Sequence, residues 1–218
     1  MTQNIAEKEQ LRKTENYIRN EFELDGSGHD WWHIYRVRNM ALKIAKKEGG
    51  DLFLIEMSAL LHDLDDWKIN SGKHLAKTKK WLKEIQVGES RKNYILQIIE
   101  EVSFKGAGVE TKANTPEARI VQDADRLDAI GAIGIARTFA YGGNKSRLIY
   151  HPDIKPVLHQ TFGEYKKTTA PTINHFYEKL LLLKNRLNTD TAIAIAENRH
   201  KFMEDFLTRF FDEWEGKK

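Results

Sequence analysis

The stretch Leu60-Leu61-His62-Asp63-Leu64-Asp65-Asp66 closes an apolar run that begins at Leu52 and predicts a buried helix. Asp66 comes one helical turn after His62, so the two side chains would share one side of that helix. Burying imidazole and carboxylate groups against an apolar helix is costly unless the groups are paired or hold a metal ion. The stretch is therefore a candidate metal site, although a His-Asp pair alone is also common by chance.

The composition indicates an ordinary globular protein, since 40% of the 218 residues are apolar and 31% are charged. The length suits one large domain over residues 1–218. The net charge of +3 is too small to indicate nucleic-acid binding. Cysteine is absent, which excludes disulfides and thiolate metal ligands. Since neither a signal peptide nor a membrane span is recognisable, we expect a cytoplasmic protein without membrane partners.

The periodicity predicts an all-α fold, because apolar residues recur at helical spacing and no segment alternates as a strand would. Gly49-Gly50 and Asp51 predict one helix end and the next helix start, and Thr115-Pro116 predicts another start. The predicted helices cover residues 4–23, 29–48, 52–61, 74–86, 89–102, 116–139, 172–187 and 191–214.

Two segments without periodicity separate some of these helices, namely residues 104–115 and 141–171. The second contains three of the four prolines and begins with Tyr141-Gly142-Gly143. It is long for a plain connection, which favours a lid or binding loop. The two glycines either let the backbone approach a ligand or simply form a turn.

Three separate segments carry groups that bind divalent ions: His29-Asp30-Trp31-Trp32-His33, His62-Asp63, and residues 122–129 with Asp123, Asp125 and Asp128. Mixed imidazole and carboxylate ligands suit Mn, Fe, Co, Ni or Zn better than Ca. Two His and two Asp would leave room for waters or phosphate oxygens, as a catalytic metal requires.

Each of these residues also has a simpler interpretation. Asp125 could pair with Arg126, Asp123 and Asp128 could be exposed, and the two tryptophans are more often packing residues. The joint occurrence of the three segments favours the metal site.

The order His33 … His62-Asp63 … Asp125 resembles that of the HD-domain metal-dependent phosphohydrolases, over nearly the whole chain. Residues 29–33, 122–137, 141–143 and 173–182 are similar to one branch, the YedJ/YpgQ-like nucleotide pyrophosphohydrolases. The resemblance implies an HD-type helical bundle that forms a single compact domain.

The resemblance also implies one divalent ion, with Mn²⁺ favoured and Mg²⁺, Co²⁺, Ni²⁺, Fe²⁺ or Zn²⁺ as alternatives. Its ligands would be His33, His62, Asp63 and Asp125. Asp125 is preferred to Asp123 and Asp128 because the family's last ligand precedes an Asp-Ala pair by three residues. Asp66 takes the place of an acidic residue, often Glu, that acts on the water or the leaving group.

The implied activity is hydrolysis of (deoxy)nucleoside triphosphates to monophosphate and pyrophosphate through a metal-activated water. Phosphates require nearby cations, and each candidate cation could instead be a solubilising surface charge. His175 and Glu178 either line the pocket or pack a helix against the domain. The candidate substrate-binding cations are Lys73, Lys77, Arg126, Lys145, Arg147 and Lys179.

Three other functions stay open: a nucleoside monophosphatase, a cyclic-nucleotide or alarmone hydrolase, and a non-catalytic metal- or nucleotide-binding module. A homo-oligomer is also open, because Phe202, Phe206, Phe210 and Trp214 suit either a core or a dimer contact.

Overall fold

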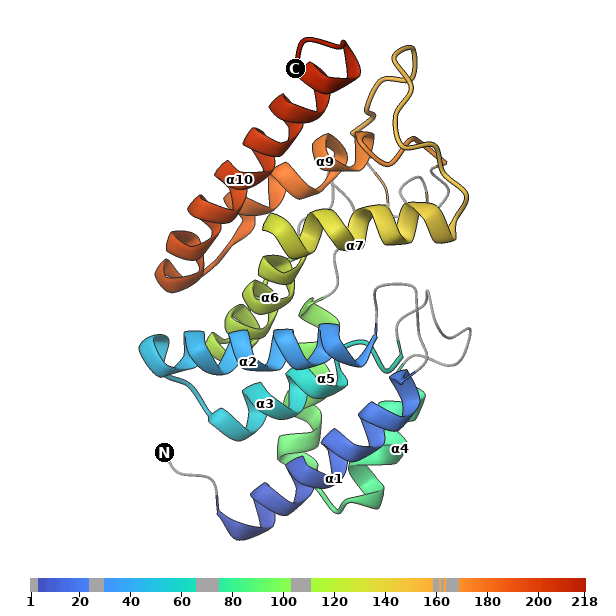
Figure 1. The fold of residues 1–218 in the computed structure, drawn as a ribbon. Coiled ribbons are helices and arrows are strands. Elements are labelled where there is room, and N and C mark those ends of the chain that lie inside the picture. Colours follow the sequence, from blue (N-terminus) through green and yellow to red (C-terminus); the bar gives the residue numbers. More distant parts are fainter. Residues whose placement is uncertain are drawn as a thin grey trace. The chain divides into compact units, whose positions relative to one another are not determined.

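The computed structural model describes residues 4–23, 30–65, 75–102, 111–158, 161, 163 and 169–218. These residues form helices and connecting segments without a β-strand, which confirms the all-α prediction (Figure 1). The chain divides into two compact units, one within Met1–Phe104 and Thr111–Asp125 and the other including Arg126–Lys218. A single domain over residues 1–218 stays a prediction.

The first unit contains five helices and most of a sixth among its described residues. The second contains the end of that sixth helix and four further elements. In the described part of the chain, no helix is both long and apolar enough to cross a lipid bilayer. The elements are α1 (Ile5–Phe22), α2 (Trp31–Glu48), α3 (Leu52–Leu61), α4 (Ala76–Glu84), α5 (Glu89–Val102), α6 (Pro116–Asp128), α7 (Gly131–Asn144), α9 (Asn174–Glu178), the 3-10 helix η1 (Leu180–Arg186) and α10 (Asp190–Trp214).

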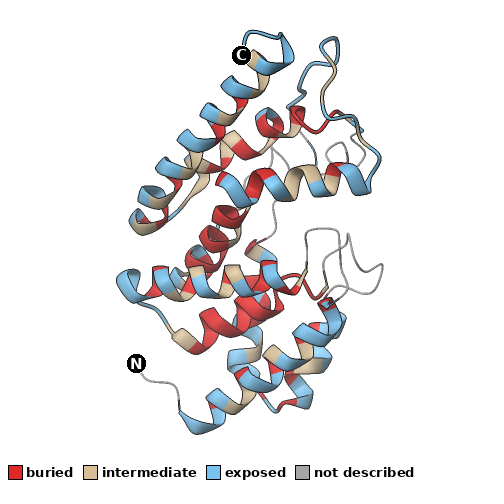
Figure 2. Ribbon diagram, in the orientation of Figure 1, coloured by how far each residue is buried: buried red, intermediate tan, exposed pale blue. Residues whose placement is uncertain are grey.

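Helix α3 is the centre of the first unit. Every residue from Phe53 to Leu61 is buried, and Figure 2 shows this helix in red along nearly its whole length. Helices α1, α2 and α5 pack against it. A helix without a polar face is stable only when it is covered on all sides, so the apolar run places α3 inside the unit.

One charged residue, Glu56, lies within this buried helix and is neutralised by Arg38 of α2. The Nε atom of Arg38 donates to the Glu56 carboxylate at 2.8 Å. A second guanidinium nitrogen lies 3.3 Å from the carboxylate of Glu15 on α1. A buried carboxylate needs a partner, and Arg38 is the partner of Glu56. Since Arg38 of α2 also contacts Glu15, it links α2 to both α1 and α3.

The boundary between α2 and α3 forms as its local sequence predicts. Gly49 has a φ of +86° and its N–H donates to the Ala45 carbonyl at 2.9 Å. Asp51 caps α3 by accepting from the N–H groups of Phe53 and Leu54. These contacts involve near neighbours in the chain, which is why they could be predicted.

Residues 116–139 form two helices, and the prediction of one continuous helix was wrong. Helix α6 ends at Asp128 and α7 begins at Gly131, whose φ of +76° favours glycine. At Gly134 an added Cβ would lie 2.2 Å from the Ala129 carbonyl oxygen. The break therefore depends on backbone conformation rather than on apolar periodicity.

Helix α7 continues through Tyr141-Gly142-Gly143 to Asn144, so the prediction of an irregular segment from residue 141 was wrong there. An added Cβ at Gly142 would lie 2.2 Å from the Thr172 hydroxyl oxygen. The glycine thus allows a close contact within the chain itself.

Residues 172–187 were predicted as one helix and instead form the short helix α9 and the 3-10 helix η1. Lys179 lies between them with φ −143° and ψ −60°, outside helical geometry. Asn174 and Glu178 are buried on α9, and both hold the preceding irregular segment. The Asn174 amide donates to the Ile154 carbonyl at 2.9 Å, and the Val157 N–H donates to Glu178 at 3.1 Å. These contacts favour the packing interpretation of Glu178.

The aromatic residues of α10 divide between interior and surface. Phe206 stacks on Phe176 with ring centroids 5.7 Å apart, whereas Phe202 and Trp214 are about half exposed, at 51% and 50%. Part of this aromatic set therefore belongs to the core of the second unit, and its role in a dimer stays a prediction.

We predict that Glu7→Gln lowers stability in a pH-dependent way. The Glu7 pKa is held below its usual value chiefly because the Arg91 side chain donates to its carboxylate, with a further bond from the Asn4 N–H. A lowered folded-state pKa gives stability that is present above the unfolded pKa of about 4.3 and is lost as pH falls through the folded value. Urea unfolding should show a loss of about 1–3 kcal/mol at neutral pH.

That loss should shrink when the same titration is repeated in acid. Glu9→Gln is the matched control, because Glu9 pairs with Arg12 on the exposed surface of the same helix. An equal loss for Glu7→Gln at neutral and acidic pH would contradict this role.

Candidate metal centre

Four predicted ligands converge in the first unit. His33 belongs to α2, His62 and Asp63 directly follow α3, and Asp125 belongs to α6. The two imidazole Nε2 atoms lie 3.2 Å apart. His33 Nε2 lies 3.3 Å from Asp63 and 3.5 Å from Asp125, and His62 Nε2 lies 3.5 Å from Asp63 and 3.9 Å from Asp125.

These separations fit a shared divalent ion. Ligand atoms placed about 2.1 Å from one ion lie roughly 3.0–3.4 Å apart in octahedral or tetrahedral geometry. The ligand atoms of His33, His62 and Asp63 all lie within 4.8 Å of one another. The Asp125 carboxylate lies beside this group, 3.5 Å from His33 Nε2 and 3.9 Å from His62 Nε2, and its role as the fourth ligand stays a prediction.

The environment of His62 prepares one nitrogen for a metal. Its Nδ1 lies 2.8 Å from the Ala59 carbonyl oxygen, so Nδ1 carries the proton and Nε2 presents a lone pair. The facing carboxylates offer only acceptor oxygens when ionised. A cluster of lone pairs facing one another is repulsive, and a cation at its centre removes the repulsion.

Burial gives the centre a closed side and a more open side. The side chains of His33, His62 and Asp63 are 1%, 2% and 8% exposed, whereas that of Asp125 is 27% exposed. Of these four side chains, that of Asp125 is therefore the most accessible to solvent. A catalytic metal needs a coordination position that water or substrate can reach, and a ligand set with three buried members and one more exposed member suits that need.

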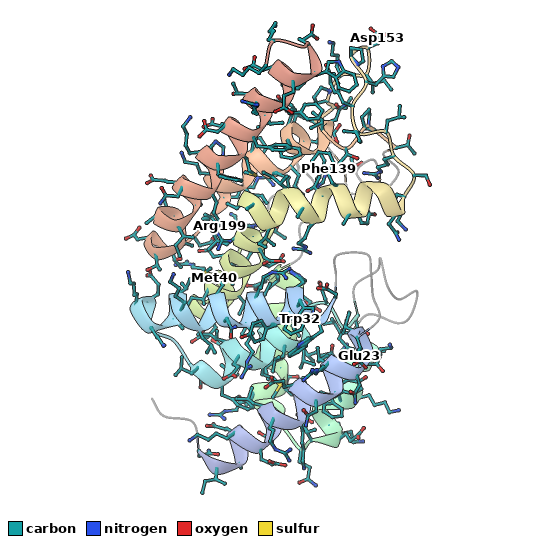
Figure 3. The ribbon with its side chains drawn as sticks, viewed as in Figure 1. Glu23, Trp32, Met40, Phe139, Asp153 and Arg199 are labelled. Carbon is teal, nitrogen blue, oxygen red and sulfur yellow. The ribbon has the colours of Figure 1, made fainter. Side chains whose placement is uncertain are left out.

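The first segment contributes one histidine and one helix cap. Asp30 accepts from the His33 N–H at 2.8 Å and is the N-cap of α2, so the helix begins after the predicted His29. His29 lies outside the described residues. Trp31 is buried, as a packing residue would be, whereas Trp32, labelled in Figure 3, is 56% exposed.

Asp123 and Asp128 are not exposed helix positions, since both are buried. Asp128 accepts from Arg137 of α7 at 2.8 Å. Asp125 differs from both in two ways, since its side chain is 27% exposed and it faces the two imidazoles.

The predicted substrate-binding cations have varied environments, and their role stays a prediction. Arg126 is buried and donates to the Arg186 carbonyl. Lys145 and Arg147 both lie over the Tyr141 ring, at 5.8 and 5.5 Å from its centroid. Lys77 pairs with Glu21 at 3.1 Å, and Lys179 is half-buried. Lys73 and the predicted catalytic Asp66 lie outside the described residues.

Sequence reasoning missed the role of Asp65. Its two carboxylate oxygens accept from the N–H groups of Lys77 and Thr78, at 3.0 and 2.8 Å. These amides belong to the first turn of α4. Because backbone amides are present at every helix start, no side-chain pattern in the sequence could have identified this contact.

The helical fold is that of an HD domain. Residues 31–130 match the HD domain family. YpgQ of Bacillus subtilis is 38% identical over 206 residues, covering 93% of both chains. Its crystal structure in complex with ADP has a TM-score of 0.75 at 33% identity, over 95% of this chain and 100% of that one.

Two further crystal structures are similar. A Lactobacillus plantarum protein has a TM-score of 0.87 at 37% identity, over 99% of each chain. An HD-superfamily hydrolase of Bacillus thuringiensis has a TM-score of 0.74 at 44% identity, over 96% of this chain and 99% of that one. The chain belongs to the HD-domain superfamily of metal-dependent phosphohydrolases.

We predict that His62→Ala abolishes metal retention and activity together, because it removes a ligand from the closed side of the centre. Mn²⁺ at about 100 times its Kd should stabilise the unaltered protein by about 2.7 kcal/mol. The variant should show neither calorimetric binding nor a Tm increase with Mn²⁺. His200→Ala is the control, since His200 pairs with Glu204 on α10. Retention of normal Mn²⁺ affinity by His62→Ala would rule out this centre.

Proposed function

We propose that the protein hydrolyses (deoxy)nucleoside triphosphates to a monophosphate and pyrophosphate. The observation that carries the proposal is the convergence of His33, His62, Asp63 and Asp125 at distances that suit one ion. Mn²⁺ is the favoured ion, with the other divalent ions as alternatives. A divalent ion in such a shell supplies Lewis acidity, which lowers the pKa of a water and polarises a phosphoryl oxygen.

The residues of the centre have separate tasks in this proposal. His62 is held by the Ala59 carbonyl, so its ligand nitrogen keeps one direction throughout turnover. Asp63 adds negative charge on the buried side. Asp125 occupies the more accessible edge, where the phosphate groups of a substrate would enter. The protein thereby orients the ion and leaves positions for water and phosphate.

Asp66 is proposed to act on the proton. It follows the ligand Asp63 by three residues, and a carboxylate there can orient the attacking water or accept its proton. The proton then passes to the leaving pyrophosphate oxygen, while the new P–O bond forms at the α phosphorus. The aspartate is shorter than the glutamate frequent in the family, so its reach is shorter.

The triphosphate requires positive charge in addition to the ion. A nucleoside triphosphate carries about four negative charges at neutral pH, which cations must offset. We propose Lys73, Arg126, Lys145, Arg147 and Lys179 for this role. Lys145 and Arg147 are supported by their shared position over the Tyr141 ring, which brings two positive groups together.

A nucleotide as substrate is supported by one relative. Bacillus subtilis YpgQ has been crystallised in complex with ADP, and it is 38% identical to this chain over 93% of its length. Triphosphates are favoured over monophosphates or cyclic nucleotides by the sequence segments shared with the pyrophosphohydrolase branch. No nucleic-acid or membrane partner is proposed.

The direct test is to incubate the purified protein with Mn²⁺ and dATP and to separate the products by chromatography. We expect dAMP and pyrophosphate in equal amounts. Free phosphate with a diphosphate product would place the attack at the γ phosphorus. Failure to form monophosphate from any common triphosphate would exclude the proposal, and parallel assays with nucleoside monophosphates and cyclic nucleotides would identify the alternatives.

We predict that Asp66→Asn retains the ion and loses most of the rate. The amide cannot accept a proton, and general base catalysis typically contributes about 10²–10⁴-fold. Mn²⁺ affinity measured by calorimetry should remain near that of the unaltered protein, while kcat falls by that factor. Full activity of Asp66→Asn would show that another group handles the proton, even if the metal centre is correct.

A further inference from the structure

Asp65 lies two residues after the ligand Asp63 and makes a pair of long-range contacts. One carboxylate oxygen accepts from the Lys77 N–H at 3.0 Å, and the other accepts from the Thr78 N–H at 2.8 Å. These amides are in the first turn of α4, where N–H groups have no partner within the helix. The side chain therefore performs the function of an N-cap from a remote position.

Helix α4 lacks a cap of its own. The residue before it, Leu75, is in the left-handed region with φ +52° and ψ +32°, and it makes no side-chain hydrogen bond to the helix. A leucine has no acceptor atom to offer in that position. Asp65 thus supplies what the local sequence of α4 does not.

Helix α4 is itself firmly placed in the first unit. The Trp81 indole stacks on Tyr17 with centroids 4.1 Å apart, and its N–H donates to the Thr14 hydroxyl at 2.9 Å. Leu82 is fully buried. The Asp65 carboxylate is therefore bound to a helix that is itself packed into the first unit.

The described part of the turn after α3, residues 62–65, is held at both ends as a result. At its beginning His62 is fixed by the Ala59 carbonyl, and the Leu64 N–H donates to the Leu61 carbonyl at 3.1 Å. At its end Asp65 is fixed by α4. Asp63 lies between these two points, so its backbone has little freedom to turn the carboxylate away from His33.

We propose that Asp65 is a positioning residue for the metal centre. Its carboxylate ties the turn carrying His62 and Asp63 to α4 and thereby holds the Asp63 ligand oxygen in place. Two backbone N–H donors in the first turn of α4 hold both of the Asp65 oxygens. Asp65 is thus assigned neither as a metal ligand nor as a proton carrier. Of the three acids in this stretch, Asp63 is the proposed ligand, Asp65 the positioning residue and Asp66 the proposed base.

The proposal rests on the metal centre but not on the identity of the substrate. Removing a residue that supports a metal ligand typically lowers the affinity for the metal by about 10–100-fold. We expect Asp65→Ala to weaken Mn²⁺ binding within that range. Hydrogen exchange at the Lys77 and Thr78 amides should be faster in the same variant. Asp65→Asn keeps one acceptor oxygen and should give an intermediate loss of affinity.

The matched control is Thr189→Ala, which removes the N-cap of α10 in the second unit. Thr189 accepts from the Ala192 N–H at 3.3 Å, so this variant loses a cap without touching the turn after α3. Its Mn²⁺ affinity should equal that of the unaltered protein. Calorimetry, circular dichroism and hydrogen exchange are all carried out below the Tm of each variant, and none of them requires turnover.

Three outcomes would overturn the proposal. Normal Mn²⁺ affinity in folded Asp65→Ala would show that Asp65 does not position Asp63. An equal affinity loss in Thr189→Ala would show a general effect of lost stability. Unchanged exchange at Lys77 and Thr78 would show that the carboxylate does not hold α4 in solution. Should the protein bind Mn²⁺ normally but hydrolyse no triphosphate, only the proposed function fails.

Discussion

The structure of the first unit depends on a charged turn that directly follows a helix without a polar face. Helix α3 must be covered on all sides, and α1, α2 and α5 cover it. His62 and Asp63 come at its end, so covering the helix also buries them. Buried ionisable groups need partners, and these arrive as His33 from α2 and Asp125 from α6. The packing of the core and the assembly of the metal centre are therefore consequences of the same burial.

Much of the helical fold could be predicted because its signals are local. Gly49, Asp51 and Thr115 mark helix ends through contacts with residues nearby in the chain. The end of α6 could not be predicted in this way. An added Cβ at Gly131 would lie 3.0 Å from the side chain of Arg199 on α10, which is labelled in Figure 3. The break depends on the left-handed backbone at Gly131, a position that also has no room for a side chain beside Arg199, and apolar periodicity carries no information about either.

The candidate site shows the same division between local and distant information. The order of His33, His62, Asp63 and Asp125 was recognisable, and the spacing that the resemblance implies favoured Asp125 over Asp123 and Asp128. The partners of those two neighbours were not recognisable. Asp128 is paired with Arg137 of another helix, and no spacing rule reveals that pairing. Asp65 was missed for a related reason, since its partners are backbone amides of α4.

The acidic residues of the turn after α3 also have separate partners. Because like charges close together repel one another, two carboxylates in one turn are easier to accommodate when each has partners of its own. Asp63 faces two imidazoles, and Asp65 faces the N-terminal amides of α4. Each carboxylate is thus held by partners on a different element, although only one residue separates the two in the chain. The amides of α4 take both oxygens of Asp65, so of these two carboxylates only that of Asp63 faces the imidazoles, and in the proposed arrangement the start of α4 contributes to the position of that ligand.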